Sequence, residues 1–220
     1  MGFRAKMCYN QGVGFPKGGD FLAENIFYRA RRAAAALFTR RCVCCGRSFS
    51  GRQCVCSECA AGLVPADEPR GDFAACASYL YEGAARDVML RFKFGDSPEL
   101  YADTLADWLC DGFDRHYDGE SFDFAVSVPS FGERPRMELF VRDFAKRRGL
   151  CYRPGLLIKT RPTEKQHRLS AAERRTNLRG AFAASEAVRG KSILLVDDIF
   201  TTGSTVGECT AELLAAGVKV

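Results

Sequence analysis

One segment near the C-terminus decides the fold that we expect, and its sequence is Ile193-Leu194-Leu195-Val196-Asp197-Asp198-Ile199-Phe200-Thr201-Thr202-Gly203-Ser204-Thr205. The four apolar residues at its start predict a short strand that is buried on both faces, as in a parallel sheet. Apolar residues at helical spacing after Gly203 predict a helix. The turn between strand and helix is therefore the candidate site.

This turn offers hydroxyl groups and backbone N–H groups at a helix N-terminus, where the helix dipole favours an anion. Asp197 and Asp198, at the carboxyl end of the strand, can accept hydrogen bonds from vicinal sugar hydroxyls. A phosphate beside a diol indicates a ribose 5-phosphate ligand. The alternative is an ordinary capped helix, since Thr and Ser are common caps. The predicted phosphate-binding residues are Thr201, Thr202, Gly203, Ser204 and Thr205.

Four cysteines near the N-terminus form two Cys-x-x-Cys pairs that ten residues separate. This spacing predicts a structural zinc site with four thiolate ligands. Zinc would supply folding free energy that so short a segment cannot obtain from a core. Unliganded or disulfide-bonded cysteines are the alternative, and we treat Cys44 and Cys54 as spare thiols. The predicted ligands are Cys42, Cys45, Cys56 and Cys59.

Positive charge is concentrated around these cysteines, although the net charge of the chain is only +5. Residues 25–57 contain no acidic side chain, so this block would attract polyanions. We expect residues 26–41 to form a basic amphipathic helix that packs on the cysteine module, with a membrane-surface role as the alternative. The arginines of the block are Arg29, Arg31, Arg32, Arg40, Arg41, Arg47 and Arg52.

The composition indicates one α/β domain with a small addition, because 220 residues with 47% apolar content can bury a real core. No run of about twenty apolar residues predicts a membrane span, and the N-terminus does not resemble a secretory signal. We therefore expect a cytoplasmic protein. The expected organisation is a flexible leader at residues 1–25, a basic helix and zinc knuckle at 26–64, and the main domain at 70–220.

Hydrophobic periodicity in the main domain predicts alternating strands and helices. Strands are expected at residues 73–81, 122–128, 156–159 and 181–183, and helices at 82–94 and 100–113. A further helix should bury Met137 and Phe144. Asp103, Asp107 and Asp111 follow one line of the second helix, where a solvated face is favoured over a metal site.

Four features together resemble the ComF family, phosphoribosyltransferase-like proteins associated with competence and natural transformation. They are the four-cysteine knuckle, the Arg-Phe-Lys-Phe-Gly-Asp stretch at residues 91–96, the Thr-x-x-Gln-x-x-Leu-Ser-x-x-x-Arg-x-x-Asn pattern at residues 163–177, and the terminal phosphate loop. The resemblance covers residues 26–220. It implies a type I phosphoribosyltransferase fold, a parallel sheet flanked by helices, behind a zinc knuckle.

The resemblance also implies a ligand, phosphoribosyl pyrophosphate with magnesium. In a transferase of this kind, Asp197 and Asp198 would hold the ribose hydroxyls and favour the positive charge that develops on the ring. A basic loop would close over the pyrophosphate, and a solvated loop is the alternative. The loop residues concerned are Lys159, Arg161, Lys165 and Arg168.

One stretch departs from the family pattern and leaves two functions open. An Arg-Gly-Phe-Asn-Gln run is absent after Val128-Pro129, and Glu133 stands where pyrophosphate would lie, with Arg134 and Arg136 as compensation. We therefore expect ligand binding to survive better than glycosyl transfer. The first function is a phosphoribosyltransferase. The second is a non-catalytic protein that senses a phosphoribosyl ligand and contacts single-stranded DNA or a DNA-uptake protein.

Overall fold

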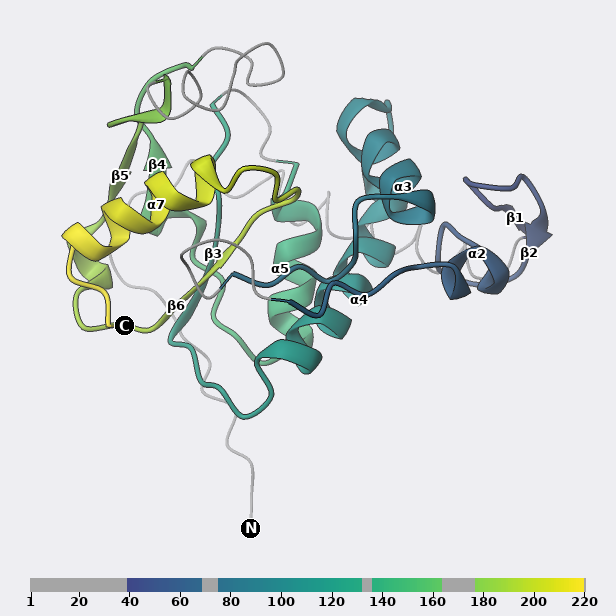
Figure 1. Ribbon diagram of the computed structural model, residues 1–220, viewed down its shortest axis with the longest axis horizontal. Coiled ribbons are helices and arrows are strands. Elements are labelled where there is room, and N and C mark those ends of the chain that lie inside the picture. The colour runs from purple at the N-terminus through teal and green to yellow at the C-terminus, as the bar shows by residue number, and fades with distance from the viewer. Residues whose placement is uncertain (1–38, 69–74, 132–135, 164–176, 220) are drawn as a thin grey trace, which may run out of the picture.

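The computed structural model describes residues 39–68, 75–131, 136–163 and 177–219, and its architecture is mixed α/β (Figure 1). Strand β3 (Phe124–Ser127) pairs in parallel with β6 (Ile193–Val196), so that Ser127 lies opposite Val196. Leu194 and Val196 pack into one apolar cluster, whereas Ile193 and Leu195 pack against another. Both faces of β6 are thus covered, as its apolar sequence predicts.

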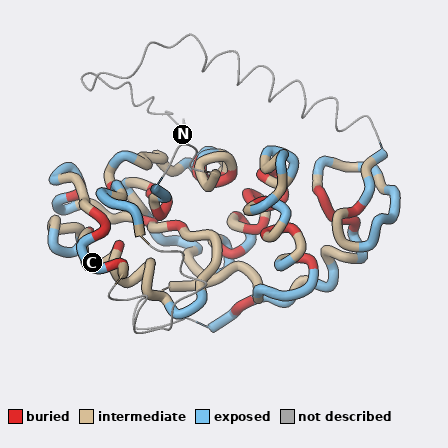
Figure 2. Tube along the Cα trace, turned by 90° about the horizontal axis from the view of Figure 1, so that it is seen from above, coloured by how far each residue is buried: buried red, intermediate tan, exposed pale blue. Residues whose placement is uncertain are grey.

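Helices cover the two faces of this strand pair (Figure 1). Side chains of α3 (Gly83–Phe94), α4 (Glu99–His116) and α5 (Glu138–Arg147) form the larger buried cluster. Figure 2 colours the buried residues red along the Cα trace. Helix α7 (Ser204–Ala215) buries Cys209 and Leu213 in the second cluster. No helix within the described ranges is long and apolar enough to cross a membrane.

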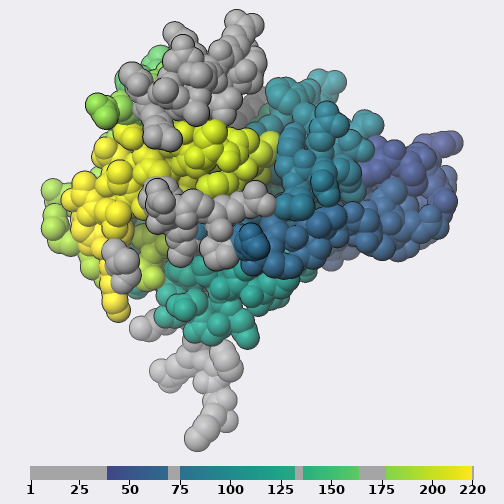
Figure 3. Space-filling view, in the orientation of Figure 1, coloured from purple at the N-terminus to yellow at the C-terminus, as the bar shows by residue number. Residues whose placement is uncertain are grey.

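Two short antiparallel sheets complete the described structure. Strand β4 (Leu157–Lys159), which follows the 3₁₀ turn η1 (Pro154–Leu156), pairs with β5 (Phe182–Ala184). Strand β5 precedes the turn η3 (Glu186–Val188). The cysteine module contains β1 (Arg40–Arg41), β2 (Ser48–Phe49) and α2 (Ser57–Ala61). This module lies at the opposite end of the molecule from α7 (Figure 3).

The structure confirms the helices predicted at residues 82–94 and 100–113 and the strands that include β3, β4, β5 and β6. The described strands form three two-stranded sheets, of which one is parallel. The strand predicted at 73–81 is wrong for residues 75–81, where Tyr79 makes only an isolated bridge to Pro65. Proline has no N–H to continue a ladder. The predicted helix at 26–41 is wrong at Arg40 and Arg41, which form β1, and residues 26–38 lie outside the described ranges.

The solvated face predicted for α4 is wrong at Asp103, which is buried, whereas Asp107 is partly buried and Asp111 is exposed. Arg147 of α5 lies 2.9 Å from Asp103, which is 7% exposed, and also pairs with Asp107. The same guanidinium contacts Asp143 one turn back on α5, at 2.6 Å. Asp111 accepts a hydrogen bond from the Tyr79 hydroxyl at 2.8 Å. The line of carboxylates therefore joins α4 to α5 and to residues 75–81.

The cysteine module docks on the same helix. The backbone N–H of Cys54 donates to the buried hydroxyl of Thr104 at 2.9 Å, and Arg52 lies 3.4 Å from Asp103. Gln53 donates to Asp107. Buried residues 54–56 share one apolar cluster with α3, α4 and α5. The module is thus attached to α4 by polar and apolar contacts together.

Replacing Arg147 with methionine should lower the free energy of unfolding by about 1–3 kcal/mol, because Asp103 would keep its charge in a buried position without its nearest partner. Chemical denaturation of both proteins would measure the difference. The control is Arg142→Met on the same helix, whose i,i+4 pair with Glu138 is more exposed and should cost less than about 0.5 kcal/mol. Equal losses in the two variants would contradict this account.

Candidate functional site

A cavity of about 370 Å³ opens where β3 and β6 end. Asp197 and Asp198, directly after β6, line it together with residues 128–131, directly after β3. Parallel strands end at the same edge of a sheet, so their pairing brings these two segments together. Ligands of α/β proteins commonly bind beyond this edge. The end of α3 contributes Phe92 and Lys93 to the same cavity.

The same two aspartates also line a second cavity, of about 230 Å³. Its lining is mostly apolar and includes residues 75–81, side chains of α3 and α4, and Val206 of α7. Asp197 and Asp198 are thus the residues that the two cavities share. Its aromatic lining comprises Tyr79, Tyr81, Trp108, Tyr117, Phe140 and Phe200.

The two aspartates have different surroundings. The backbone N–H of Asp198 donates to Oδ1 of Asp197 at 2.8 Å, and Nζ of Lys93 lies 2.9 Å from Oδ2 of Asp198. Burial raises the pKa of Asp197 to about 7, and the neighbouring Asp198 charge adds to this rise. The Asp198 N–H and Lys93 act in the opposite direction. Asp197 therefore changes its charge near neutral pH, which is common for groups in ligand sites.

The predicted phosphate loop has the backbone that an anion site needs. Gly203 adopts the left-handed conformation at φ 71°, and a Cβ there would lie 2.8 Å from the Phe200 ring, so both conformation and space favour glycine. Helix α7 starts at Ser204 with no side-chain cap and no acidic residue in its first turn. The Thr202 and Ser204 hydroxyls lie 2.8 Å apart. The loop residues themselves, 201–205, line neither cavity.

The predicted loop lysine and arginine lie elsewhere. Lys159 donates to the Thr163 hydroxyl at 2.7 Å, and burial lowers its pKa. Arg161 donates to the backbone carbonyls of Asn177 at 3.0 Å and Arg179 at 2.8 Å. Neither side chain lines a cavity. Four further predicted residues lie outside the described ranges: Glu133, Arg134, Lys165 and Arg168.

Lys93, which the structure brings to the site, was not among the predicted site residues, although residues 91–96 were noted. Arg136, which was expected to compensate for Glu133, lines the cavity, and its guanidinium donates to the carbonyls of Phe92 at 2.8 Å and Gly95 at 3.1 Å. A Cβ at Gly95 would lie 2.5 Å from the Arg91 carbonyl oxygen. Glycine at this position therefore allows a tight turn directly after α3. The hydrogen bonds from Arg136 stabilise this turn beside the cavity.

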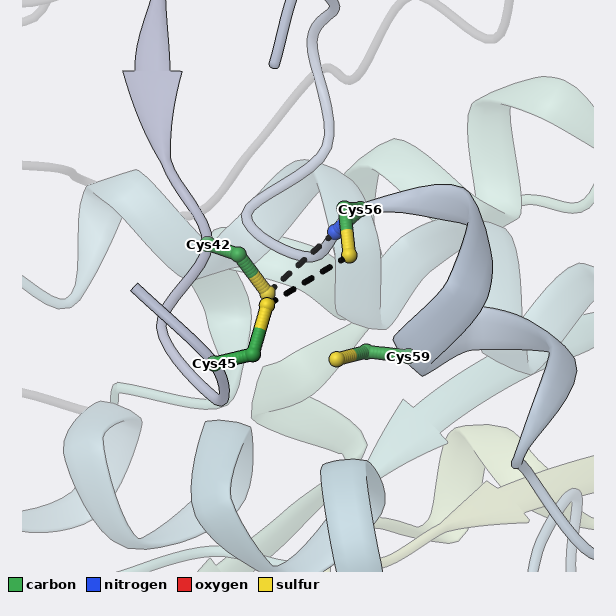
Figure 4. A group of neighbouring side chains, drawn as sticks. All are labelled: Cys42, Cys45, Cys56 and Cys59. Carbon is green, nitrogen blue, oxygen red and sulfur yellow. Dashed lines mark hydrogen bonds between the residues drawn. The ribbon is translucent and has the colours of Figure 1, made fainter. Parts of the chain in front are cut away.

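The four predicted cysteine ligands form one cluster (Figure 4). Their sulfur atoms all lie within 4.8 Å of one another, and Sγ of Cys45 lies 3.7 Å from Sγ of Cys56. Four thiolates around tetrahedral zinc lie about 3.8 Å apart, given a Zn–S bond of about 2.3 Å. The cluster is therefore compatible with structural zinc.

The thiols of the cluster differ in acidity. Burial raises the pKa of Cys42, but backbone N–H groups, among them that of Cys56 at 3.4 Å, outweigh this effect and lower it to about 6. The pKa of Cys59 is raised, because its S–H can donate to the sulfur atoms of Cys45 and Cys56 and because a thiolate there would be repelled by charge on Cys42. A divalent cation would remove this repulsion. Burial raises the pKa of Cys44 to about 12, which suits a spare thiol.

The described part of the basic block is partly neutralised by its own fold. Arg47 pairs with Glu58, and Arg52 pairs with Asp103. Arg40 donates to the carbonyl of Arg52 at 2.7 Å. These contacts reduce the positive charge that the cysteine module offers to a polyanion. The remaining arginines of the block, Arg29, Arg31 and Arg32, lie outside the described ranges.

Curated bacterial proteins resemble parts of this chain. A protein named DNA utilization protein YhgH from Escherichia coli (strain K12) is 48% identical over 67 residues, which is 29% of this chain and 30% of that protein. The protein of the same name from Salmonella typhi is 36% identical over 101 residues, 43% of this chain and 44% of that protein. The chain thus spans less than half the length of these relatives. No family model matches the chain.

We expect the purified protein to contain about one zinc ion per chain, bound by the four clustered thiols, which metal analysis would measure. Cys59→Ser should lose the metal and much of the stability of the module, since zinc supplies its folding free energy. Cys44→Ser is the matched control and should keep the metal. A folded, metal-free protein whose four cysteines form two disulfides would contradict the prediction.

Proposed function

We propose that this protein binds phosphoribosyl pyrophosphate, or a related ribose 5-phosphate compound, in the cavity beyond β3 and β6. The single observation that carries this proposal is the pair Asp197 and Asp198 in the cavity wall, followed within a few residues by the left-handed Gly203 and the uncapped start of α7. The carboxylates accept hydrogen bonds from the 2- and 3-hydroxyls. The N-terminus of α7 binds the 5-phosphate.

The fold that best accounts for this arrangement is that of the type I phosphoribosyltransferases. Two features support it: β3 and β6 are parallel neighbours, and their following loops meet at one cavity. In this scheme residues 128–131 approach the pyrophosphate. The sequence resemblance assigns Lys159, Arg161, Lys165 and Arg168 to the same group.

Magnesium would arrive with the pyrophosphate. Among the described residues, the only group of three or more clustered metal-ligating side chains is the cysteine quartet. Mg²⁺ commonly keeps several waters and binds through substrate phosphates. We therefore assign the ion to the oxygens of the ligand.

The cellular role that we propose is in DNA utilization, because the relatives carry that name. Competence and DNA uptake are the processes that the sequence resemblance suggests, and thiolate-bound zinc suits a cytoplasmic, reducing compartment. The chain acts there either as a glycosyltransferase or as a ligand-dependent partner of single-stranded DNA or an uptake protein. A pyrophosphate-release assay across candidate acceptors separates the two. A protein that binds phosphoribosyl pyrophosphate but releases no pyrophosphate with any acceptor would support the role as a ligand-dependent partner.

Replacing both Asp197 and Asp198 with asparagine should weaken phosphoribosyl pyrophosphate binding in calorimetry. Each lost charge-assisted hydrogen bond to a hydroxyl typically costs about 1.5–3 kcal/mol. The thermal midpoint should change little, since burial already opposes the Asp197 charge. Asp123→Asn, which removes an exposed partner of Lys191, is the control and should keep wild-type affinity. Unchanged affinity in the double variant would exclude these carboxylates from ribose recognition.

Ligand affinity should also fall as the pH drops below about 7. The raised pKa of Asp197 means that its carboxylate gains a proton in this range and can then accept fewer hydrogen bonds. Protein stability should change in the opposite sense: because the folded state binds this proton more tightly than the unfolded state, stability decreases as the pH rises from about 4 to 7. Calorimetry at pH 6 and pH 8 would test the first effect. The affinity of Asp197→Asn should change less between these two pH values. An equal change in both proteins would show that Asp197 is not the cause of the pH dependence.

A further inference from the structure

Lys93 occupies an unusual position for a residue of the last helical turn of α3. Its ammonium lies 2.9 Å from Asp198 although the two residues are far apart in the sequence. Its side chain is 31% exposed, so the ammonium can reach both the carboxylate and the cavity. Among the described residues that line this cavity, the cationic side chains are Lys93 and Arg136.

The backbone around Lys93 is held firmly. Phe92 is 1% exposed and packs edge-on against Phe140 of α5, with ring centroids 5.2 Å apart. Arg136 donates to the carbonyls of Phe92 and Gly95, on either side of Lys93. The guanidinium of Arg136 therefore binds backbone carbonyls of this turn. The ammonium of Lys93 instead pairs with Asp198, a side chain that lines the cavity.

The chemistry of an ammonium suits a bridging role. It has three N–H donors, and the pair with Asp198 uses only part of them. An anionic group in the cavity can accept hydrogen bonds from the remaining N–H donors while the contact with Asp198 is kept. The carboxylates without Lys93 would instead repel a second anion, because like charges in a partly buried site interact strongly.

We propose that Lys93 binds the anionic group carried at C1 of the ribose ligand and thereby makes the site prefer phosphoribosyl pyrophosphate to ribose 5-phosphate. This inference rests on the proposed function. It adds a substrate-binding residue that neither the signature loop nor the basic loop contains. It also explains why the end of α3 is tied by Arg136 to the segment that follows β3.

The test compares both ligands by calorimetry in one magnesium-containing buffer. Wild-type protein should bind phosphoribosyl pyrophosphate at least about tenfold more tightly than ribose 5-phosphate. Lys93→Met should lose most of this preference, with ribose 5-phosphate affinity within about threefold of wild type, and Lys93→Arg should restore part of it. Lys191→Met is the matched control, because Lys191 also pairs with an aspartate, Asp123, but lies away from both cavities.

The outcomes separate this inference from the proposed function. A wild-type protein that binds both ligands, with an unchanged preference in folded Lys93→Met, overturns the role of Lys93 and leaves the ribose site intact. A wild-type protein that binds neither ligand overturns both. A thermal midpoint for each variant shows that it is folded. If Lys93→Met unfolds, the test uses the preference of Lys93→Arg for phosphoribosyl pyrophosphate over ribose 5-phosphate. Loss of binding to both ligands in folded Lys93→Arg overturns the selective role of Lys93.

Discussion

The parallel pairing of β3 with β6 is the interaction on which the candidate site depends. Its register places Ser127 opposite Val196, so both strands end at the same edge of the sheet. The two aspartates after β6 thereby face the loop after β3 across one cavity. A shift of one residue would turn every side chain of β6 to the other face, and the two apolar clusters that cover the strand oppose such a shift.

A second set of interactions connects this edge to the rest of the molecule. Arg136, which follows the β3 loop, holds the end of α3, and Phe92 in that turn packs on α5. Helix α5 in turn binds α4 through Arg147 and its aspartates. The cysteine module contacts the same aspartates from the other side. The cysteine module and the cavity beyond β3 and β6 are therefore parts of one packed body that α4 and α5 connect.

Such a body suits the proposed site, in which an anionic ligand would lie beside two aspartates. The aspartate pair and an anionic ligand would repel each other in water-poor surroundings unless cations and helix dipoles compensate. Here the compensation comes from elements that are distant in the chain: Lys93 from α3 and the N-terminus of α7. Because both are attached to the core, their charges are oriented before the ligand arrives, which lowers the cost of binding.

The sequence by itself determined the local features of this protein. Periodicity predicted α3, α4 and β6, and the Cys-x-x-Cys spacing predicted the thiol cluster, because each depends on residues close in the chain. Only the tertiary structure decided which charges meet. It paired Lys93 with Asp198, brought Arg136 to the end of α3, and buried Asp103 of α4 against Arg147. Ion pairs between distant segments leave no periodic signal, since their partners are chosen by packing and not by spacing.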